Sequence, residues 1–488
     1  LLDCSKVEDA GSLRRRSGFV HGMRQRTTLS RLLTLVAGLV ATVVLASACA
    51  PAESNDAVSS QVDGLPNPAV PSQTTAVASN SFMATASDTD VEKAVAVFID
   101  SSTTATATAL VETIADNRNE RWVPWLIDLL RINVSMQVSA LIATTLEAIT
   151  GVESQARIAD MIGYGSWSQT RQLDGGHGYV DFKATLYERI DPEFGPLIRS
   201  IVDQVEVAGV QWGGVPLGGI PELNDPARVP AAQADWMVDD EIVLGVIANG
   251  QAVAYPLRIL ARHELANDTI GGEDLALVYC TLCRSALVFE RNVAGERLDF
   301  QTSGLLLNSN KIMYDVQTGS LWSHLRGVGI GGPLLGTELT LRSVNHMRWS
   351  DWFAENPNTE VLKLPRPIFF DDPERPPISY DYTPGEAYRS YYDNPDVWFP
   401  ILDVPDTFAI KTEVVGIERN GDTVAFDVAA FNALGQIVEI EVGGDLLTVE
   451  PTGAGVRVFD AAADRIITEQ SFWFAWHANH PDTRTLDF

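Results

Sequence analysis

Two cysteines, Cys280 and Cys283, stand three positions apart in the second half of the chain. This C-x-x-C spacing allows three kinds of chemistry. Both sulfurs can bind one metal ion, because two intervening residues let them point into the same turn. The pair can also cycle between dithiol and disulfide, because the spacing lowers the pKa of one thiol. The third alternative is a structural disulfide, and the motif alone leaves all three open.

The flanking residues predict that the motif lies on a turn between two strands. Residues 275–279 form a short apolar run, which is typical of a buried strand, and residues 285–290 are strand-like again. No helix pattern follows Cys283. In thioredoxin-like proteins a helix begins at the motif, and its N-terminus stabilises the thiolate. The sequence therefore weakens a thioredoxin-like interpretation without excluding redox chemistry.

His263 and Glu264 precede the cysteines and are candidates for the same site. Residues 256–268 predict a short helix with proline in its first turn, ending near Asn267. Adjacent residues on a helix point about 100° apart, so both side chains can face one small site only where the helix ends. We expect His263 to be the ligand. A buried histidine bonded to the backbone is the alternative, and it stays open.

A second histidine, His324, follows the cysteines in a predicted hairpin with a Thr-Gly turn. With His263 it completes a Cys2His2 set, which suits one transition-metal ion, zinc or copper. His324 shares a strand face with Trp322, because the two are two positions apart. Residues expected to support the ligands or to line a pocket are Glu264, Asn267, Asp268, Asn308, Asn310, Tyr314 and Trp322.

The C-terminal tail carries aromatic residues at 472–476, followed by His477 and His480. These side chains can line a pocket or plug the core, and we favour the plug. The sequence does not say whether the two histidines approach the cysteines.

The fold class predicted is α+β, with an all-helical region at residues 91–206 followed by a β-rich domain at 207–488. Residues 138–151 predict a helix closed by Gly151. Paired helices of this kind resemble HEAT-type repeats, in which helix hairpins stack. A small helical bundle is the alternative. We expect any protein partner to contact this helical region.

The β-rich domain contains an internal repeat, with one unit at about 241–283 and another at about 413–453. Each unit has a strand, an Asn-Gly turn and a second strand, which is the strongest short signal for a hairpin. The second unit has 450–453 where the first has the C-x-x-C motif, and nothing in place of His263. The repeated part is therefore expected to be scaffold, and the unique part to be the site.

Residues 1–48 are interpreted as an upstream segment and a signal peptide that starts at Met23. A positive stretch precedes the apolar run 32–46, and small residues then lead to Cys49. These last residues resemble a bacterial lipobox, which implies lipid on Cys49. The apolar run is shorter than the ~20 residues that span a bilayer. Residues 49–90 predict a disordered tether. We expect an exported lipoprotein, at the outer face of the membrane or in the periplasm.

The formal net charge is −29, from 35 Lys and Arg against 64 Asp and Glu. Such an acidic surface repels nucleic acids, so we expect no nucleic-acid partner. The chain has no G-x-S-x-G, Walker or H-E-x-x-H motif and no dinucleotide-binding fingerprint in a suitable context. These observations leave open whether the protein is an enzyme, and they identify no small-molecule ligand.

Several motifs together resemble the prokaryotic family of domain of unknown function 3179 (DUF3179). They stand at 212–215, 254–260, 263–264, 279–283, 303–310, 313–315, 317–323 and 472–476. The resemblance covers about 207–488, and the helical region looks like the extension of some members. It implies little about activity, because the family is uncharacterised. Members usually have glycine where this chain has Arg284, and often glutamine where it has His324. The resemblance thus leaves Cys280, Cys283 and His263 as the core set.

Three hypotheses follow. The first is a membrane-tethered protein with a metal site at Cys280 and Cys283, acting as an enzyme or a carrier. The second is a thiol–disulfide redox protein that uses the same pair, with His263 tuning the thiolate. The third is a binding or scaffold module in which the pair forms a structural disulfide.

Overall fold

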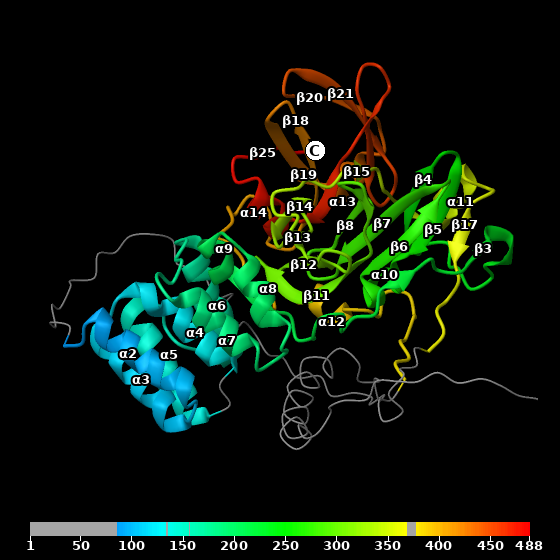
Figure 1. Ribbon diagram of the computed structural model, residues 1–488. Helices are drawn as coiled ribbons and strands as arrows, with labels where there is room; N and C mark the ends of the chain where they lie inside the picture. Colours follow the sequence, from blue (N-terminus) through cyan, green and yellow to red (C-terminus); the bar gives the residue numbers. More distant parts are fainter. Residues whose placement is uncertain (1–84, 133–134, 156, 368–376) are drawn as a thin grey trace, which may run out of the picture.

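A computed structural model describes residues 85–132, 135–155, 157–367 and 377–488. It contains helices in the N-terminal part and a β-rich C-terminal domain (Figure 1). The predicted signal peptide, Cys49 and nearly all of the predicted tether lie outside the described residues. Within those ranges, no helix is both long enough and apolar enough to cross a membrane.

Local sequence signals explain where the N-terminal helices begin and end. Thr103 starts α3 by accepting a hydrogen bond from the Thr106 amide. Gly151 ends α5 in the left-handed region, at φ +72°, which confirms the predicted glycine cap. The helices are α2 (Asp88–Asp100), α3 (Thr104–Asn117), α4 (Val123–Ile132), α5 (Met136–Thr150), α6 (Arg157–Thr170), α7 (Tyr179–Tyr187), α8 (Phe194–Ser200) and α9 (Gln204–Gly209).

The described part of the β-rich domain forms five sheets of four or five strands, arranged as a five-bladed propeller, plus a two-stranded hairpin. Two of the sheets, sheets 1 and 2, position the cysteines and the residues around them. Sheet 1 is β1 (Val210–Trp212), β11 (Phe300–Leu307), β12 (Asn310–Asp315), β13 (Leu321–Ser323) and β14 (Val328–Gly331). Sheet 2 is β15 (Leu341–Arg342), β8 (Ser285–Glu290), β7 (Glu273–Cys280), β6 (Leu265–Ile270) and β2 (Leu223–Asn224).

The other three sheets complete the propeller. Sheet 3 is β16 (Asn345–Arg348), β4 (Ile242–Ala248), β5 (Gln251–Pro256), β17 (Glu360–Leu362) and β3 (Arg228–Pro230). Sheet 4 is β24 (Glu469–Phe472), β18 (Glu413–Arg419), β19 (Asp422–Asp427) and β25 (Arg484–Thr485). Sheet 5 is β20 (Val438–Val442), β21 (Asp445–Pro451), β22 (Val456–Phe459) and β23 (Arg465–Ile466).

Sheets 3 and 4 share one layout. Each is built on an antiparallel hairpin, β4–β5 or β18–β19, closed by an Asn-Gly turn with positive φ at both residues. Such turns match the twist of the strands, so the predicted hairpins are confirmed. An antiparallel strand on one side of each hairpin leads into a short helix, α11 (Trp349–Glu355) or α14 (Trp473–Asn479). A parallel strand lies on the other side.

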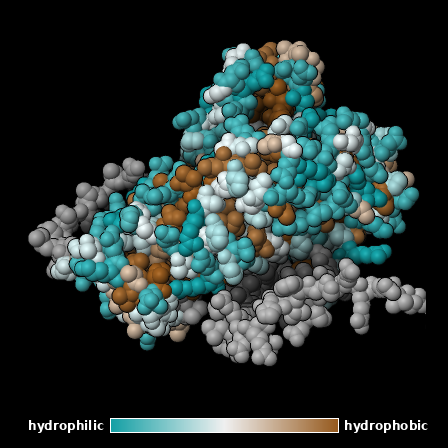
Figure 2. All heavy atoms as spheres, in the orientation of Figure 1, coloured by the Kyte–Doolittle hydropathy of each residue, from teal (hydrophilic) through white to brown (hydrophobic). Residues whose placement is uncertain are grey.

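The N-terminal helices and sheet 1 share a single hydrophobic core. Leu305, Ile312, Leu321 and Ile330 of sheet 1 belong to the same buried cluster as the apolar faces of the helices. Figure 1 shows α8 and α9 on the side of the helical region that adjoins sheet 1. The visible surface mixes hydrophilic residues with separate hydrophobic patches (Figure 2). Isolated patches of this kind are normal on soluble surfaces.

The helix predicted to run to Asn267 is wrong in its C-terminal half. Helix α10 (Leu257–His263) ends six residues after it begins, because Glu264 adopts the left-handed conformation at φ +59°. The Glu264 amide caps the helix by donating to the Leu260 carbonyl. The chain then continues as β6, which places Asn267 and Asp268 in a strand paired with β7.

Candidate functional site

The C-x-x-C motif lies on a tight turn between β7 and β8, as the sequence predicted. Cys280 ends β7 and Cys283 lies in the turn, where its carbonyl accepts a 2.7 Å hydrogen bond from the Phe472 amide of β24. Both cysteines are free thiols, and they are only 2% and 0% exposed. The turn is therefore anchored to sheet 4 and closed off from solvent.

The pKa values of the two thiols are shifted in opposite directions. Burial opposes ionisation of Cys280, but its hydrogen bond with Cys283 and the nearby Lys311 ammonium outweigh burial and hold the pKa of Cys280 below its usual value. Burial raises the pKa of Cys283 well above its usual value, and its hydrogen bond to Cys280 adds to this. Cys280 is therefore the more acidic of the two thiols.

Ser309 and Asn310 contact the Cys283 sulfur, and His324 contacts Asn310 in turn. The thiol donates to the Ser309 carbonyl at 3.2 Å, and the Asn310 amide nitrogen lies 3.3 Å from the same sulfur. That nitrogen also lies 3.5 Å from Nδ1 of His324. Burial, followed by the Lys311 charge, lowers the pKa of His324 to about 3, so its ring is neutral. Asn310 therefore contacts Cys283 directly, and His324 lies next to Asn310 without a direct cysteine contact among the described hydrogen bonds.

A buried ion pair lies on the other side of the motif. Lys311 of β12 pairs with Glu264, and the two side chains are only 3% and 8% exposed. The Glu264 carboxylate also accepts a 2.9 Å hydrogen bond from Thr281, which lies between the cysteines, while Lys311 donates to Thr302 at 2.9 Å. These extra hydrogen bonds offset part of the cost of burying two charges. Sequence reasoning assigned Lys311 no role.

Tyrosines from a distant segment cover the turn. Tyr391 and Tyr392, in α12 (Arg389–Tyr392), donate to the carbonyls of Leu282 and Thr281 at 3.0 and 2.9 Å. Tyr391 itself is fully buried. The Lys411 ammonium ties the segment down by donating to the Tyr391 carbonyl at 2.7 Å.

Left-handed backbone conformations gather around the cysteines. Glu264, Arg284, Asn308, Ser309 and Tyr388 all have φ between +51° and +61°. Non-glycine residues adopt this conformation at a cost of order 1 kcal/mol, and such residues tend to cluster at functional sites. Arg284 stands where the resembling family usually has glycine, and its φ of +52° is the physical reason why glycine suits this position.

Both ring nitrogens of His263 form hydrogen bonds with residues other than the cysteines. Its Nδ1 lies 2.7 Å from the Pro221 carbonyl and its Nε2 lies 2.7 Å from the Tyr382 hydroxyl. Burial lowers its pKa, so the ring is neutral. Throughout the described ranges, no group of three or more His, Cys, Asp or Glu side chains is arranged to hold a metal ion. Metal binding at the predicted four-residue set therefore stays a prediction.

A comparison with protein families identifies this β-rich domain. A family model described as "Protein of unknown function (DUF3179)" matches residues 217–483, more than half of the chain. The chain belongs to this family. The DUF3179 match contains the C-x-x-C turn, the Glu264–Lys311 pair and α12, whereas the N-terminal helices lie outside it. No curated protein and no solved structure matches the chain.

The remaining predicted residues serve other parts of the DUF3179 domain. Asn267 bridges sheets by donating to the Asn224 side chain and the Phe300 carbonyl, at 2.7 and 2.9 Å. Asp268 accepts a 2.6 Å hydrogen bond from Tyr255. Trp322 donates to Asp315, and Tyr314 is half-buried on β12. These contacts hold strands together rather than surround the cysteines.

The C-terminal aromatics form a plug, as expected. Trp473 and Trp476 of α14 are 1% and 2% exposed. His477 packs on Trp473, and His480 stacks on Trp476 with ring centres 3.8 Å apart. Both histidines thus contact the plug rather than the C-x-x-C turn.

Two residues near the cysteines, Lys311 and Glu469, are candidates for a functional role that the sequence patterns did not identify. Lys311 is the only lysine between residues 184 and 362, and that isolation is the signal that could have drawn attention to it. Glu469 of β24 is buried, and burial raises its pKa to about 8 despite a hydrogen bond from Ser471. When Glu469 is ionised, its charge opposes ionisation of Cys283. No local pattern distinguishes Glu469 from an ordinary surface glutamate.

Proposed function

We propose that this DUF3179 protein is a thiol–disulfide redox protein in which Cys280 attacks and Cys283 resolves. The observation that carries the proposal is the pair of buried free thiols on one anchored turn, beside the buried Glu264–Lys311 pair. Redox dithiols work through one acidic thiol and one that keeps its proton, and the opposite pKa shifts of Cys280 and Cys283 fit that division.

The reaction balances as a two-electron exchange. The Cys280 thiolate attacks one sulfur of a partner disulfide, and the other partner sulfur leaves as a thiolate. Cys283 then loses its proton to that leaving group and attacks the Cys280 sulfur of the mixed disulfide, which releases the second partner sulfur as a thiolate. That thiolate takes up from solvent the proton that Cys280 lost when it ionised, so the partner disulfide becomes two thiols and the cysteines become a disulfide. Because Tyr391 and Tyr392 cover the turn, α12 must move aside for the partner to enter.

The decisive measurement is the reduction potential of the Cys280–Cys283 pair. The purified full chain would be equilibrated in thiol–disulfide buffers, and its free thiols counted by mass after alkylation. A potential well above about −300 mV is expected for a redox pair. A lower value would identify a structural disulfide, and the scaffold hypothesis would replace this one.

Two variants test how the neighbours tune Cys280. The Glu264→Gln variant is expected to lower the pKa of Cys280, because the Glu264 charge raises it, and Lys311→Met is expected to raise it. The thiolate absorbance followed against pH gives both values. Lys363→Met, at an exposed lysine, is the control. Shifts in the same direction for both variants would contradict electrostatic tuning.

A metal site is the second candidate. The Asn310 amide nitrogen lies 3.3 Å from the Cys283 sulfur and 3.5 Å from Nδ1 of His324. Two thiols and an imidazole are ligand types that suit zinc or copper(I), but the described residues do not arrange them as a metal site, so metal binding would require these side chains to move. His263 would join only by giving up Tyr382. Metal per chain, measured by mass spectrometry on untagged protein with His324→Gln as the variant, separates this candidate from the redox pair.

We also infer that the protein is exported and tethered through lipid on Cys49, on the strength of the apolar run and small residues that precede it. A Cys49→Ser variant would then leave the membrane fraction. Retention of that variant in the membrane fraction would exclude this anchor. Contacts between the helical region and a protein partner remain an expectation.

We further infer that sheets 3 and 4 descend from one duplicated β unit. A Cβ on Gly271 would lie 2.2 Å from the Ala248 carbonyl oxygen, and one on Gly443 would lie 2.1 Å from that of Arg419. The side chains of Asn249 and Asn420 donate to the carbonyls of these same glycines, at 3.0 and 3.1 Å. Matching contacts at equivalent positions support common origin. The HEAT-like interpretation of the helices stays a prediction.

A further inference from the structure

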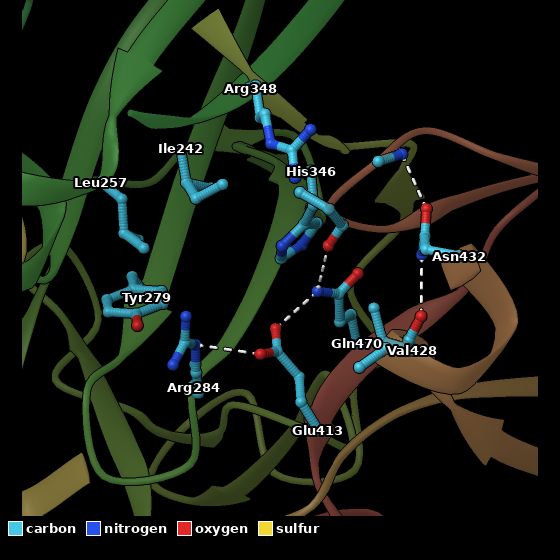
Figure 3. A pocket seen from close by; sticks show the side chains of 13 residues that line it. Ile242, Leu257, Tyr279, Arg284, His346, Arg348, Glu413, Val428, Asn432 and Gln470 are labelled. Carbon is cyan, nitrogen blue, oxygen red and sulfur yellow. Dashed lines mark hydrogen bonds and ion pairs between the residues drawn. The ribbon is translucent and has the colours of Figure 1, made fainter. Parts of the chain in front are cut away.

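A cavity of about 230 Å³ lies between sheets 3 and 4, beside the C-x-x-C turn but separate from the cysteine sulfurs. Its walls come from β4 and β16 on one side, and from β18, β24 and α13 (Val428–Leu434) on the other. Tyr279 and Arg284, which flank the two cysteines in sequence, close its end (Figure 3). Nothing in the redox proposal uses this space.

The one carboxylate in the wall is already neutralised. Glu413 forms an ion pair with Arg284 at 3.1 Å. It also accepts a 2.5 Å hydrogen bond from the Gln470 amide, which is held in place by donating to the Ala454 carbonyl at 2.9 Å. Glu413 and Arg284 therefore cancel each other, and neither supplies net charge to the cavity.

Arg348 is the second arginine that lines the cavity, and unlike Arg284 it has no carboxylate partner in the cavity wall. It follows His346 by two positions on β16, so the two side chains share the strand face that lines the cavity. Figure 3 shows the Arg348 guanidinium directed toward the middle of the cavity. No ion pair or hydrogen bond of the Arg348 side chain occurs with any residue in the described ranges. Arg348 is an exposed residue, and its guanidinium and the Asp351 carboxylate both lie close to Gly453. Because the guanidinium forms no ion pair, it is available to an anion in the cavity.

His346 adds a second unsatisfied group. Its side chain is 8% exposed, and Nε2 has no hydrogen-bond partner within the described part of the chain. Burial, reinforced by the Arg284 charge, lowers the pKa of His346 to about 3, so its ring is neutral and can donate one hydrogen bond. A buried polar atom without a partner costs about 1–3 kcal/mol, and such atoms call for an explanation.

Apart from Asn432 and Gln470, the remaining side chains of the wall are mainly apolar. Ile242, Leu257 and Val428 line it, together with the Tyr279 ring. A ligand whose anionic group binds Arg348 and His346 would therefore place its uncharged, apolar part in contact with these side chains. The chain as a whole carries −29, so an anion is attracted only where local cations prevail.

We propose that this cavity binds a small molecule that carries a carboxylate or phosphate group on an apolar body. Arg348 pairs with the oxyanion, the His346 ring donates a hydrogen bond to it, and Ile242, Leu257 and Val428 contact the apolar part. The proposal holds whether or not Cys280 and Cys283 are a redox pair. Because Tyr279 and Arg284 flank those cysteines, the bound molecule would lie next to the C-x-x-C turn.

Calorimetric titration of the purified full chain tests the proposal. The probes are benzoate for the carboxylate, phenyl phosphate for the phosphate and benzamide as a neutral molecule of the same shape. At least one anion is expected to bind with one-to-one stoichiometry and about 10-fold or more tighter than benzamide. Which anion binds tighter distinguishes the two oxyanion chemistries.

Arg348→Gln is expected to weaken binding of that anion about 10-fold or more, because it removes the charge but keeps a hydrogen-bonding side chain. Arg342→Gln, at an exposed arginine of β15 paired with Glu273 and Glu290, is the control and should bind as the unaltered chain does. His346→Gln, with its fold checked by circular dichroism, tests the second contact. The proposal is overturned if neither anion binds tighter than benzamide, or if Arg348→Gln leaves affinity unchanged.

Discussion

Ionisation of Glu469 should make the stability of the fold depend on pH near neutrality. Burial raises its pKa to about 8 from an ordinary 4.5. The folded chain therefore holds a proton that the unfolded chain has lost between those two values. The contribution of Glu469 to the free energy of unfolding is greatest below about pH 4.5 and is lost as the pH rises to about 8. The free energy of unfolding falls over this range by at most about 1.4 kcal/mol per pH unit.

A Glu469→Gln variant removes that proton uptake and keeps the shape of the side chain. Its unfolding midpoint in denaturant should change less between pH 5 and 8 than that of the unaltered chain, and it should be the more stable of the two at pH 8. Equal pH slopes for both proteins would show that Glu469 is already ionised in the folded state.

Arg284 allows a comparison of backbone strain with side-chain contacts. Its φ of +52° favours glycine, while its guanidinium pairs with Glu413 and lies 5.2 Å from the centre of the Tyr392 ring. Both Arg284→Gly and Arg284→Ala lose these contacts equally. Chemical denaturation should therefore find the glycine variant about 1 kcal/mol more stable than the alanine variant. The reverse order would mean that the loop relaxes away from the left-handed region.

At the scale of elements, glycines set how closely the short helices approach the hairpins. A Cβ on Gly416 of β18 would lie 2.2 Å from the Trp476 ring of α14. In sheet 3, a Cβ on Gly245 would lie 2.3 Å from Trp352 of α11. The indole rings pack directly on the strand backbone, so no side chain fits between.

Gly416→Ala is expected to destabilise the protein by about 1–3 kcal/mol, because the Trp476 ring must shift out of a close-packed core. Gly163→Ala is the matched control, since a Cβ there meets nothing within 4 Å on helix α6. That change should stabilise the chain by about 0.5–1 kcal/mol. Thermal unfolding of both variants gives the comparison, and a neutral Gly416→Ala would mean that α14 docks loosely.

At the scale of the whole molecule, the shared core joins the helices to the propeller. Ile312 of β12 is buried in the core of the N-terminal helices. Polar contacts add to it, since Arg326 pairs with Glu206 at 2.7 Å and the Ile401 amide donates to Ser166 at 3.0 Å. Two parts that share a core should unfold together.

Ile312→Ala should accordingly lower the unfolding temperature of helical and tryptophan signals together, at a cost of about 2–5 kcal/mol. Calorimetry of the unaltered chain should show one main transition. Val442→Ala, in the core beneath sheet 5, creates a comparable cavity far from the helices and serves as the control. A helical transition that moves independently of the propeller would contradict a common core.

Local patterns in the sequence determined much of this architecture. Apolar runs interrupted by Cys280 and Cys283 predicted a turn between strands, and Gly151 predicted the end of α5. Asn-Gly pairs predicted both hairpins. These signals are reliable because each is a property of a few adjacent residues, namely side-chain period, turn conformation or helix capping.

Only the tertiary structure decided which side chains accompany the cysteines. Lys311 arrives on a neighbouring sheet, and Tyr391 arrives from a segment more than a hundred residues away. Where α10 ends was equally decisive, because the left-handed Glu264 sends its carboxylate to Lys311 while His263 bonds to Tyr382. Contacts between residues distant in sequence depend on how sheets pack, and no period or turn signal along the chain encodes that packing.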